Sequence, residues 1–568
     1  MKRFLLAAAA CAAVMAGPAA QAQAPAAVPA AAQPAPAFVL YVSPASRALL
    51  TVDPDLKWRV NRWRELIVER GATFAVATHP AQLAAMPRGS AIVMPSAVVL
   101  GDEERRVIAA RIAAGDGLLA TGMPGTLDGR GLPILPAFLE QTFAVKTKIA
   151  RLEDKGFLIP FGDTPLTYTV TAGARLWTAQ DTRFTTPVLA SPGSGYLSDW
   201  SRAVHDTGLL SFTTVGNSRR ALLGWSEPAW EAHPAEFRRI AHAALDWVEG
   251  RPIAFARAWP APYRAAMTLG VDALWRFENL PRIAEAFSKG GVRASFHFLS
   301  ADVAANAAAI RDLAKAGHSV GGFGDSNALF AGQPAAEQEA RVERVLGQFR
   351  NAFGADIPVA GLRVPQGATD AATEKAAAPV GYLVDLGRVD SSIPVLAPDG
   401  KLVVLSNNAN VDAQSSAKEV AEGLSQAARQ ARLLHGYAYA GIDAAGFTAD
   451  SPMERGLAQF VGAAGELGKT LWMAPAADVA AWWRQRERVK VSSTWSAADS
   501  ILTLEIAVSG PMPFPSAVAL VPPPGRGTVR LEDALAGARL QPEADGGPSI
   551  VLTGLPAGRH RLRLRFQP

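Results

Sequence analysis

Apolar and polar positions in the first half of the chain follow two different periods. Short apolar runs bounded by turn residues predict buried strands over residues 38–42, 73–77, 91–94, 117–121 and 220–224. Apolar residues at helical spacing predict helices over residues 58–70, 102–114 and 234–249. Strands that alternate with helices are typical of a parallel sheet covered on both faces. We therefore predict a doubly wound α/β domain over residues 38–250.

A second α/β pattern occupies residues 263–488, after a proline-rich linker at 252–262. It opens with an apolar strand at 265–270, and helical periodicity follows over residues 279–289, 304–316 and 335–353. Strands and helices alternate here as they do in the first domain. We predict that this region is a separate α/β domain.

The pattern changes again after residue 488, where short strands are separated by glycine and proline. Such spacing is typical of a small antiparallel sandwich, which we predict over residues 489–568. In its final strand, residues 561–566, arginine alternates with leucine and phenylalanine. We expect an edge strand whose arginines face solvent and discourage further pairing.

The N-terminus has the three parts of a secretory signal peptide. Lys2 and Arg3 precede a short apolar run, which is followed by small residues suited to cleavage. We predict a signal peptide over residues 1–24 and an extended Ala/Pro linker over residues 25–37. The protein is then expected to be periplasmic or secreted. No later apolar stretch is long enough to predict a membrane span.

Composition narrows the classes of function. Hydrophobic residues make up 49% of the 568 residues and charged residues 19%, which excludes a disordered chain. A formal net charge of +5 is too weak to indicate a nucleic-acid partner at this length. The single cysteine, Cys11, lies within the predicted signal peptide. The mature chain then has no thiolate nucleophile, no disulfide and no cysteine-ligated zinc.

In the first domain, the stretch Ala114-Gly-Asp-Gly-Leu-Leu-Ala-Thr-Gly122 resembles the class I glutamine-amidotransferase-like fold. Active members of that family carry a cysteine nucleophile with a histidine partner. Because the mature chain has no cysteine, the resemblance implies the scaffold and not the activity.

Three motifs and a closing strand and helix of the second α/β domain occur in the order of a known family. The motifs are Gly291-Val-Arg-Ala-Ser-Phe-His-Phe-Leu299, Gly317-His-Ser-Val-Gly321 and Arg363-Val-Pro-Gln-Gly367, and the closing strand and helix lie in residues 471–484. Together they resemble the polysaccharide deacetylase family, which removes acetyl groups from chitin-like glycans, peptidoglycan and exopolysaccharides. The resemblance implies a distorted (β/α) barrel over residues 263–488 and a polysaccharide or peptidoglycan-type partner.

The family also implies a catalytic site. Its members hold a divalent metal, expected to be zinc, with one aspartate and two histidines, and a second aspartate serves as general base. The first family motif, Thr-Phe-Asp-Asp, corresponds here to Thr268-Leu-Gly-Val-Asp272, which keeps one carboxylate. Asp272 is therefore the candidate metal ligand and a candidate catalytic residue. Arg363, in the Arg-x-Pro-x-Gly motif, is the second catalytic candidate.

The chain departs from the family at the imidazole positions. The two ligand histidines correspond to Phe323 and Asn327, and no histidine follows the strand at 437–441 to act as general acid. A site of Asp272 and Asp325 without an imidazole is a poor zinc site and favours at best an oxygen-preferring cation. Further candidates for contact with the glycan are the polar or aromatic residues Asp325, Asp385, Asp443 and Trp472.

Three functions remain open on the sequence. The first is a deacetylase-family protein of the cell envelope that acts on or binds an acetylated glycan through a degenerate metal site. The second is a non-catalytic protein that binds glycans or assists polysaccharide assembly. The third is a glycoside hydrolase that uses Asp272 and Asp443, which requires their carboxyl groups to lie about 5–9.5 Å apart.

Overall fold

The computed structural model describes most of the chain from residue 35 onward. The described residues are 35–51, 55–147, 157–160, 162–177, 188–190, 194–196, 198–200, 208–385, 393–411, 414–433, 435–542 and 547–567. The predicted signal peptide and Cys11 lie outside these residues. Within the described part of the chain, no helix combines the length and the apolar character needed to cross a bilayer.

The first domain is built on a seven-stranded sheet in the order β2-β1-β3-β4-β12-β11-β9. The strands predicted from sequence are all present, as β1 (Phe38–Tyr41), β2 (Phe74–Ala77), β3 (Ala91–Met94), β4 (Leu118–Thr121) and β12 (Ser218–Leu223). These five pair in parallel. The sheet is extended by two antiparallel strands, β11 (Leu210–Val215) and β9 (Ser194–Tyr196).

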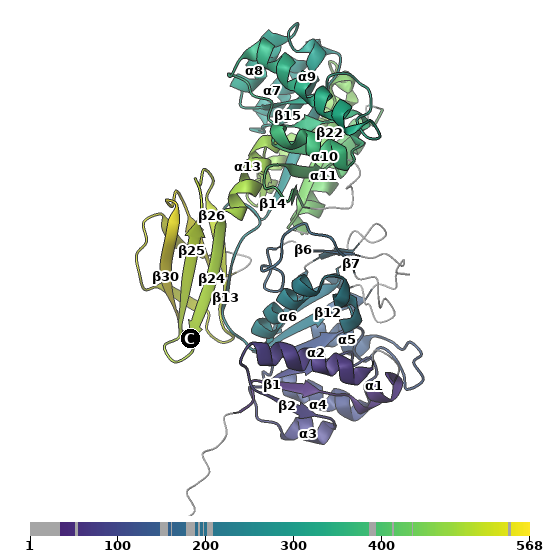
Figure 1. The fold of residues 1–568 in the computed structure, drawn as a ribbon, viewed down its shortest axis with the longest axis vertical. Helices are drawn as coiled ribbons and strands as arrows, with labels where there is room; N and C mark the ends of the chain where they lie inside the picture. Colours follow the sequence, from purple (N-terminus) through teal and green to yellow (C-terminus); the bar gives the residue numbers. More distant parts are fainter. Residues whose placement is uncertain are drawn as a thin grey trace, which may run out of the picture. The chain divides into compact units, whose positions relative to one another are not determined.

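Helices cover both faces of this sheet, because successive residues of each strand point to opposite sides. Phe38 and Leu40 pack in one core with α2 (Leu56–Glu69) and α6 (Pro234–Val248). Val39 and Tyr41 pack in a second core with helices on the other face, α3 (Pro80–Ala85), α4 (Asp102–Ala113) and α5 (Ala137–Phe143). The doubly wound architecture is confirmed, and Figure 1 shows α6 lying beside β12. The amidotransferase resemblance of this domain stays a prediction.

The second α/β domain contains a sheet whose strands follow the order β19-β20-β18-β17-β16-β15-β14-β22-β21, with β23 also paired to β14. Its strands are β14 (Ala265–Ala273), β15 (Ser295–Leu299), β16 (Ser319–Gly324), β17 (Leu362–Arg363), β18 (Tyr382–Asp385), β19 (Val395–Leu396), β20 (Val403–Ser406), β21 (Ala409–Val411), β22 (Tyr437–Asp443) and β23 (Leu471–Met473). All pairings are parallel except that of β19.

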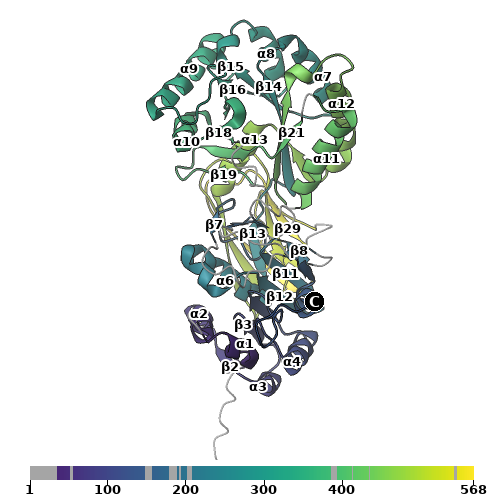
Figure 2. The ribbon, with the colours of Figure 1, turned by 90° about the vertical axis from the view of Figure 1, so that its right-hand side faces the viewer.

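Helices surround the outside of this curved sheet, as Figure 2 shows. They are α7 (Leu280–Lys289), α8 (Ala307–Lys315), α9 (Ala335–Phe353), α10 (Ala371–Ala377), α11 (Ala417–Leu433), α12 (Pro452–Leu467) and α13 (Ala476–Glu487). A curled parallel sheet with outer helices is the distorted (β/α) barrel that the sequence predicted.

Alternation along the strands separates the helix-facing core from the barrel interior. In β14, Leu269 and Val271 pack toward the helices, so Gly270 and Asp272 face inward. The interior beneath Asp272 is filled by buried tyrosines, among them Tyr439. A side chain on Gly270 would collide with the Tyr439 hydroxyl, so glycine is required where this ring crosses the barrel.

The C-terminal domain is a sandwich of two four-stranded sheets around a shared apolar core. One sheet has the order β24-β25-β30-β27, with β24 (Val489–Ser496), β25 (Ile501–Val508), β30 (Gly558–Gln567) and β27 (Thr528–Leu531). The other has the order β13-β26-β29-β28, with β13 (Ile253–Ala256), β26 (Ser516–Val521), β29 (Ser549–Leu552) and β28 (Ala538–Gln541).

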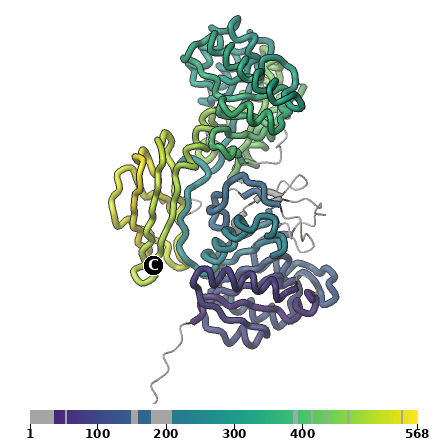
Figure 3. Tube along the Cα trace, in the orientation of Figure 1, coloured from purple at the N-terminus to yellow at the C-terminus, as the bar shows by residue number. Residues whose placement is uncertain are grey.

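Two features of the sandwich differ from expectation. Part of the predicted linker, Ile253–Ala256, forms β13 and pairs with β26, so distant segments lie side by side (Figure 3). The predicted edge strand 561–566 is wrong: it belongs to β30, which pairs with both β25 and β27. Its arginines alternate with the buried residues Leu562 and Leu564, so solvent exposure of one face does not require an edge position.

Candidate functional site

The candidate site lies where the inward-facing side chains reach the carboxyl ends of the barrel strands. Asp272 is the second-last residue of β14, in register with His297 on β15 and with Asp443 on β22. Parallel strands bring their carboxyl ends to one edge of a sheet. Asp272 and Asp443 therefore end neighbouring strands on the same inner face, about 4.8 Å apart at the backbone.

The Asp272 carboxylate is paired with Arg363, which ends β17. The distance from Arg363 Nε to Asp272 Oδ1 is 2.6 Å, and the two side chains are 9% and 16% exposed. Burial raises the pKa of Asp272 to about 6; the guanidinium lowers it, and the charge of Asp443 adds to the rise. Burial opposes the charge of Arg363, but attraction to Asp272 outweighs it and raises the pKa of the arginine.

One asparagine, Asn407, fixes the guanidinium from the other side. With its amide oriented to satisfy its neighbours, fully buried Asn407 accepts a hydrogen bond from Arg363 Nη1 at 2.9 Å. In that orientation it also donates to the carbonyl oxygens of Tyr439 and Ala409, at 3.1 and 2.8 Å. Gly441 leaves room for this arrangement, since a Cβ there would lie 3.2 Å from Arg363 Nη2 and 2.8 Å from Oδ1 of exposed Asn410.

Aromatic and imidazole side chains form the floor of the site. The Arg363 guanidinium carbon lies 5.8 Å from the centre of the Tyr439 ring. His297 is fully buried, and its Nε2 lies 3.1 Å from the hydroxyl of Tyr382. Burial, with a smaller effect from the charge of Arg363, lowers the pKa of His297 to about 3. The imidazole is therefore neutral at physiological pH and belongs to the barrel core.

Asp443 shares the site with Asp272, whereas three other candidates lie elsewhere. Asp443 is partly exposed and accepts a hydrogen bond from the backbone of Ala445 at 2.9 Å. Asp325 follows β16 and pairs with Nε of Arg341 and of Arg344 on α9, at 2.8 and 2.9 Å. Burial acts against its charge, but these two hydrogen bonds lower the pKa of Asp325 overall. Its contacts within the described residues are those of a residue that anchors α9.

Asp385 and Trp472 are also separated from Asp272. Asp385 ends β18 on the face that it shares with Leu383, which packs toward the outer helices. Trp472 is 7% exposed, stacks on Tyr263 and lies in register with Ala266, at the opposite end of β14. Six residues of strand separate Ala266 from Asp272, which is about 20 Å.

The sequence analysis missed three residues of the site: Asn407, Asn410 and Tyr439. Two signals were present in the sequence. The segment 407–410 reads Asn-Asn-Ala-Asn directly after the apolar strand β20, so amides cluster at a strand end. In β22, tyrosine alternates with alanine, which places both tyrosines of that strand on one face.

The donor set at Asp272 does not fit the zinc ion that the family resemblance implies. One oxygen of the carboxylate already faces a guanidinium at 2.6 Å. Phe323, which the sequence predicted at a ligand position, offers no donor atom and is 5% exposed. Across the described part of the chain, no three His, Cys, Asp or Glu side chains gather in a way that could hold a metal ion.

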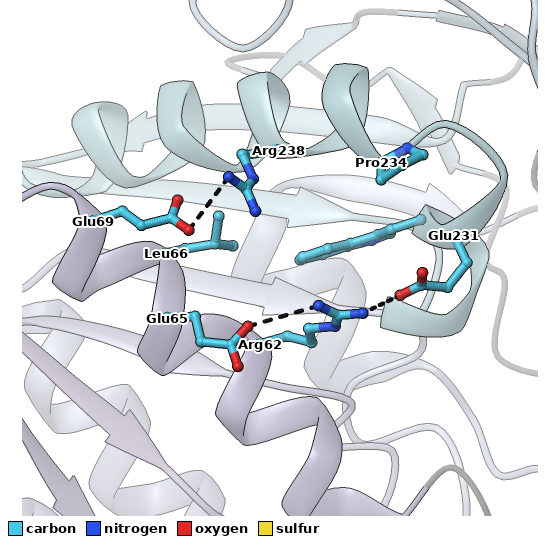
Figure 4. A pocket seen from close by; sticks show the side chains of 8 residues that line it. Arg62, Glu65, Leu66, Glu69, Glu231, Pro234 and Arg238 are labelled. Atoms are coloured by element: carbon cyan, nitrogen blue, oxygen red, sulfur yellow. Dashed lines mark hydrogen bonds and ion pairs between the residues drawn. The ribbon is translucent and has the colours of Figure 1, made fainter.

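A pocket in the first domain provides a contrast with the barrel site. Figure 4 shows it between α2 and the start of α6, lined by charged side chains around an aromatic ring. Arg62 pairs with Glu231 at 2.5 Å and with Glu65 at 3.7 Å, and Arg238 pairs with Glu69 at 3.4 Å. The charges that line this pocket therefore pair with one another across its rim.

A comparison with protein-family models matches residues 263–384 to the polysaccharide deacetylase family. No curated protein sequence matches the chain. Among solved structures, Agd3, described as a novel carbohydrate deacetylase, is 10% identical with a TM-score of 0.39; the alignment covers 93% of this chain and 99% of that one.

Two further structures match the barrel region. A family 4 carbohydrate esterase from Streptomyces lividans is 15% identical over 37% of this chain and 92% of its own, with a TM-score of 0.27. A family 4 pseudoenzyme from Bacillus anthracis is 16% identical over 39% of this chain and 66% of its own, with a TM-score of 0.29. By its match to the family model, the region 263–384 of this chain belongs to the polysaccharide deacetylase family.

Proposed function

We propose that this protein binds an acetylated glycan of the cell envelope at the carboxyl ends of its barrel strands, without hydrolysis by the metal route of its family. The observation that carries the proposal is the ion pair between Asp272 and Arg363. It places a fixed guanidinium against the carboxylate from which a metal site would have to be built. The predicted signal peptide supports a periplasmic or secreted location.

Hydrolysis of an acetamide requires an activated water and a proton donor for the leaving amine. One oxygen of the Asp272 carboxylate is held by Arg363 at 2.6 Å, so this oxygen is not free to take a proton from water. His297 is neutral, but it is fully buried and lies against the hydroxyl of Tyr382. His297 is therefore not placed to move a proton to or from a bound sugar.

The same groups are suited to hold a sugar. Carboxylates accept hydrogen bonds from hydroxyl groups, and amide and guanidinium groups donate to carbonyl oxygens such as that of an acetyl group. Asp443 and Asn410 are accessible beside the buried pair, and Arg363 is fixed by Asp272 and Asn407. A preorganised polar cluster loses little entropy when a ligand binds.

A glycoside hydrolase is the second candidate, favoured by one observation. Asp272 and Asp443 are in register on neighbouring strands, and burial raises the pKa of Asp272 to about 6. Two carboxyl groups in different environments are what acid and base roles require. New reducing ends released from a glycan would support this function over binding alone.

The experiment compares binding with turnover in the full-length mature protein. N-acetylated oligosaccharides are titrated calorimetrically, and acetate release is measured after zinc loading and after chelation. We expect the same Kd in both samples and no acetate. Acetate release that requires zinc would overturn the proposal, as would a failure of the wild-type protein to bind acetylated glycans.

Variants test whether the ion pair forms the binding site. We expect Arg363→Lys to weaken binding at least tenfold, because lysine keeps the charge but cannot bond Asp272 and Asn407 in one plane. Arg282→Ala is the matched control: its guanidinium is 47% exposed and pairs with Glu454 on the outer helices. Unchanged binding by Arg363→Lys would show that this arginine does not contribute to the binding site.

A further inference from the structure

The inference concerns Trp275, and it rests on the proposed function. Most tryptophans of the described chain are buried in the domain cores: Trp63, Trp225, Trp230, Trp247, Trp259, Trp472, Trp482 and Trp483. Trp275 is 51% exposed, and Trp177 of the first domain is 39% exposed. We propose that the indole of Trp275 is a stacking platform for a pyranose ring of the bound glycan.

Trp275 lies at the edge of the barrel that carries the candidate site. It lies two residues after Ala273, the last residue of β14, and three residues after Asp272. Three residues of chain span at most about 11 Å between Cα atoms. The indole is therefore within one or two sugar units of the buried ion pair.

After Trp275, the loop contacts both strands that flank β14. Phe277 stacks on Phe298 of β15, with ring centres 6.0 Å apart and an angle of 15° between planes. Asn279 donates through Nδ2 to the carbonyl oxygen of Ala444 at 3.1 Å. Because Ala444 follows Asp443, this bond ties the loop to the strand end that carries the second carboxylate.

The backbone just before these two contacts has an uncommon conformation. Arg276 has φ 63° and ψ 43°, in the left-handed region, where a non-glycine residue is strained. Its carbonyl oxygen accepts a hydrogen bond from the backbone of Asn279 at 2.9 Å. The fold therefore holds Trp275 in a defined exposed position, while Phe277 in the same loop packs against the helix-facing core.

An exposed indole beside hydrogen-bonding groups matches the two kinds of surface on a sugar. One face of a pyranose ring carries C–H groups that pack on an aromatic ring, and the hydroxyl groups project from the edge. Asp272 and Asp443 at the neighbouring strand ends supply acceptors for those hydroxyls. The chemical class that fits both surfaces is a pyranose of the acetylated glycan.

The test compares three tryptophan variants of the full-length mature protein by titration with N-acetylated oligosaccharides. We expect Trp275→Ala to raise the Kd about tenfold, and Trp275→Phe to retain most of the affinity because a ring remains. Trp177→Ala is the matched control, since it removes an exposed indole from the first domain, and its Kd should equal that of the wild type. Binding should also change tryptophan fluorescence in the wild type and not in Trp275→Ala.

The outcomes separate this inference from the proposed function. Wild-type affinity in Trp275→Ala, together with weakened binding by Arg363→Lys, would overturn the stacking role and leave the proposed function standing. No binding by the wild type would overturn the proposed function itself. The urea midpoint should not change in Trp275→Ala, because half of the side chain is already in water. A large fall in that midpoint would assign Trp275 to the fold and contradict the proposal.

Discussion

The two α/β domains each bury an arginine beside a carboxylate, but the two pairs differ in what surrounds the carboxylate. In the first domain, Arg59 Nη1 lies 3.7 Å from Glu227 Oε2, and the side chains are 1% and 0% exposed. In the barrel, Arg363 Nε lies 2.6 Å from Asp272 Oδ1, and the side chains are 9% and 16% exposed. The pair of the first domain is thus enclosed in the core, whereas the pair of the barrel lies at strand ends that solvent can reach.

The carboxylate of Glu227 is fully used within the core. Its Oε1 accepts hydrogen bonds from Trp63 Nε1 and Thr121 Oγ1, at 2.9 and 2.6 Å. Its Oε2 accepts from the hydroxyl of Ser96 at 2.6 Å. A buried network with every acceptor satisfied stabilises one arrangement of the core and leaves no group for a ligand.

Ser96 shows why geometry alone does not make a site. It follows β3 with φ 43°, in the left-handed region, as a nucleophilic serine does on a sharp turn after a strand. Its side chain is fully buried, and its hydroxyl donates to Glu227. The strained serine is therefore a structural hydrogen-bond donor. Access to solvent is what distinguishes the barrel edge from this cluster.

The largest effect on stability is expected for the Arg59–Glu227 pair of the first domain. Glu227→Ala leaves the charge of Arg59 buried without its carboxylate, and we expect the free energy of unfolding to fall by about 3–5 kcal/mol. Urea denaturation measures this loss, and calorimetry on the folded protein should give an unchanged Kd for the acetylated glycan. A stable Glu227→Ala variant that loses glycan binding would reverse the roles we assign to the two pairs.

A smaller effect on stability, with a defined pH dependence, is expected for the Arg363–Asp272 pair of the barrel. The pKa of Asp272 is raised from 3.8 to about 6, so the folded state holds this proton more tightly than the unfolded state does. The contribution of Asp272 to stability is therefore highest below pH 4 and declines as the pH rises through 6. Over that window the loss is about 3 kcal/mol.

Asp272→Asn removes this titration. We expect the free energy of unfolding of the wild type, relative to that of the variant, to fall between pH 4 and pH 7. Comparing the two proteins at each pH cancels the contribution of His297, whose lowered pKa acts in the opposite direction. A difference that is constant with pH would show that Asp272 titrates normally in the folded protein.

The smallest effect is expected at the pocket of Figure 4. Arg62→Ala removes ion pairs to Glu231 and Glu65, but all three side chains are more than a third exposed. Solvent screens such pairs, so we expect a loss of at most about 1 kcal/mol in urea denaturation. A loss as large as that of Glu227→Ala would mean that exposure does not separate the strong pairs from the weak ones.

Local patterns in the sequence were enough to predict the five parallel strands and three of the helices of the first domain, and the opening strand and three of the helices of the second. They also placed Asp272 and Asp443 at strand ends, since a strand that ends in a carboxylate is visible in one short segment. The prediction that residues 561–566 form an edge strand was wrong. Alternation of apolar and polar residues shows which side of a strand is buried, but it does not show how many strands pair with it. Strand β13 was missed for the same reason: its partner β26 lies more than 250 residues away.

The sequence by itself predicted the family of the barrel, the replacement of the imidazole positions and the single aspartate of the first motif, because these are properties of residue identity. Only the tertiary structure decided that Arg363 meets Asp272, that Asn407 holds the guanidinium, and that Trp275 is left exposed. These contacts join separate strands of one sheet, and their energies depend on distance and access to water. Neither quantity is set until the chain has folded.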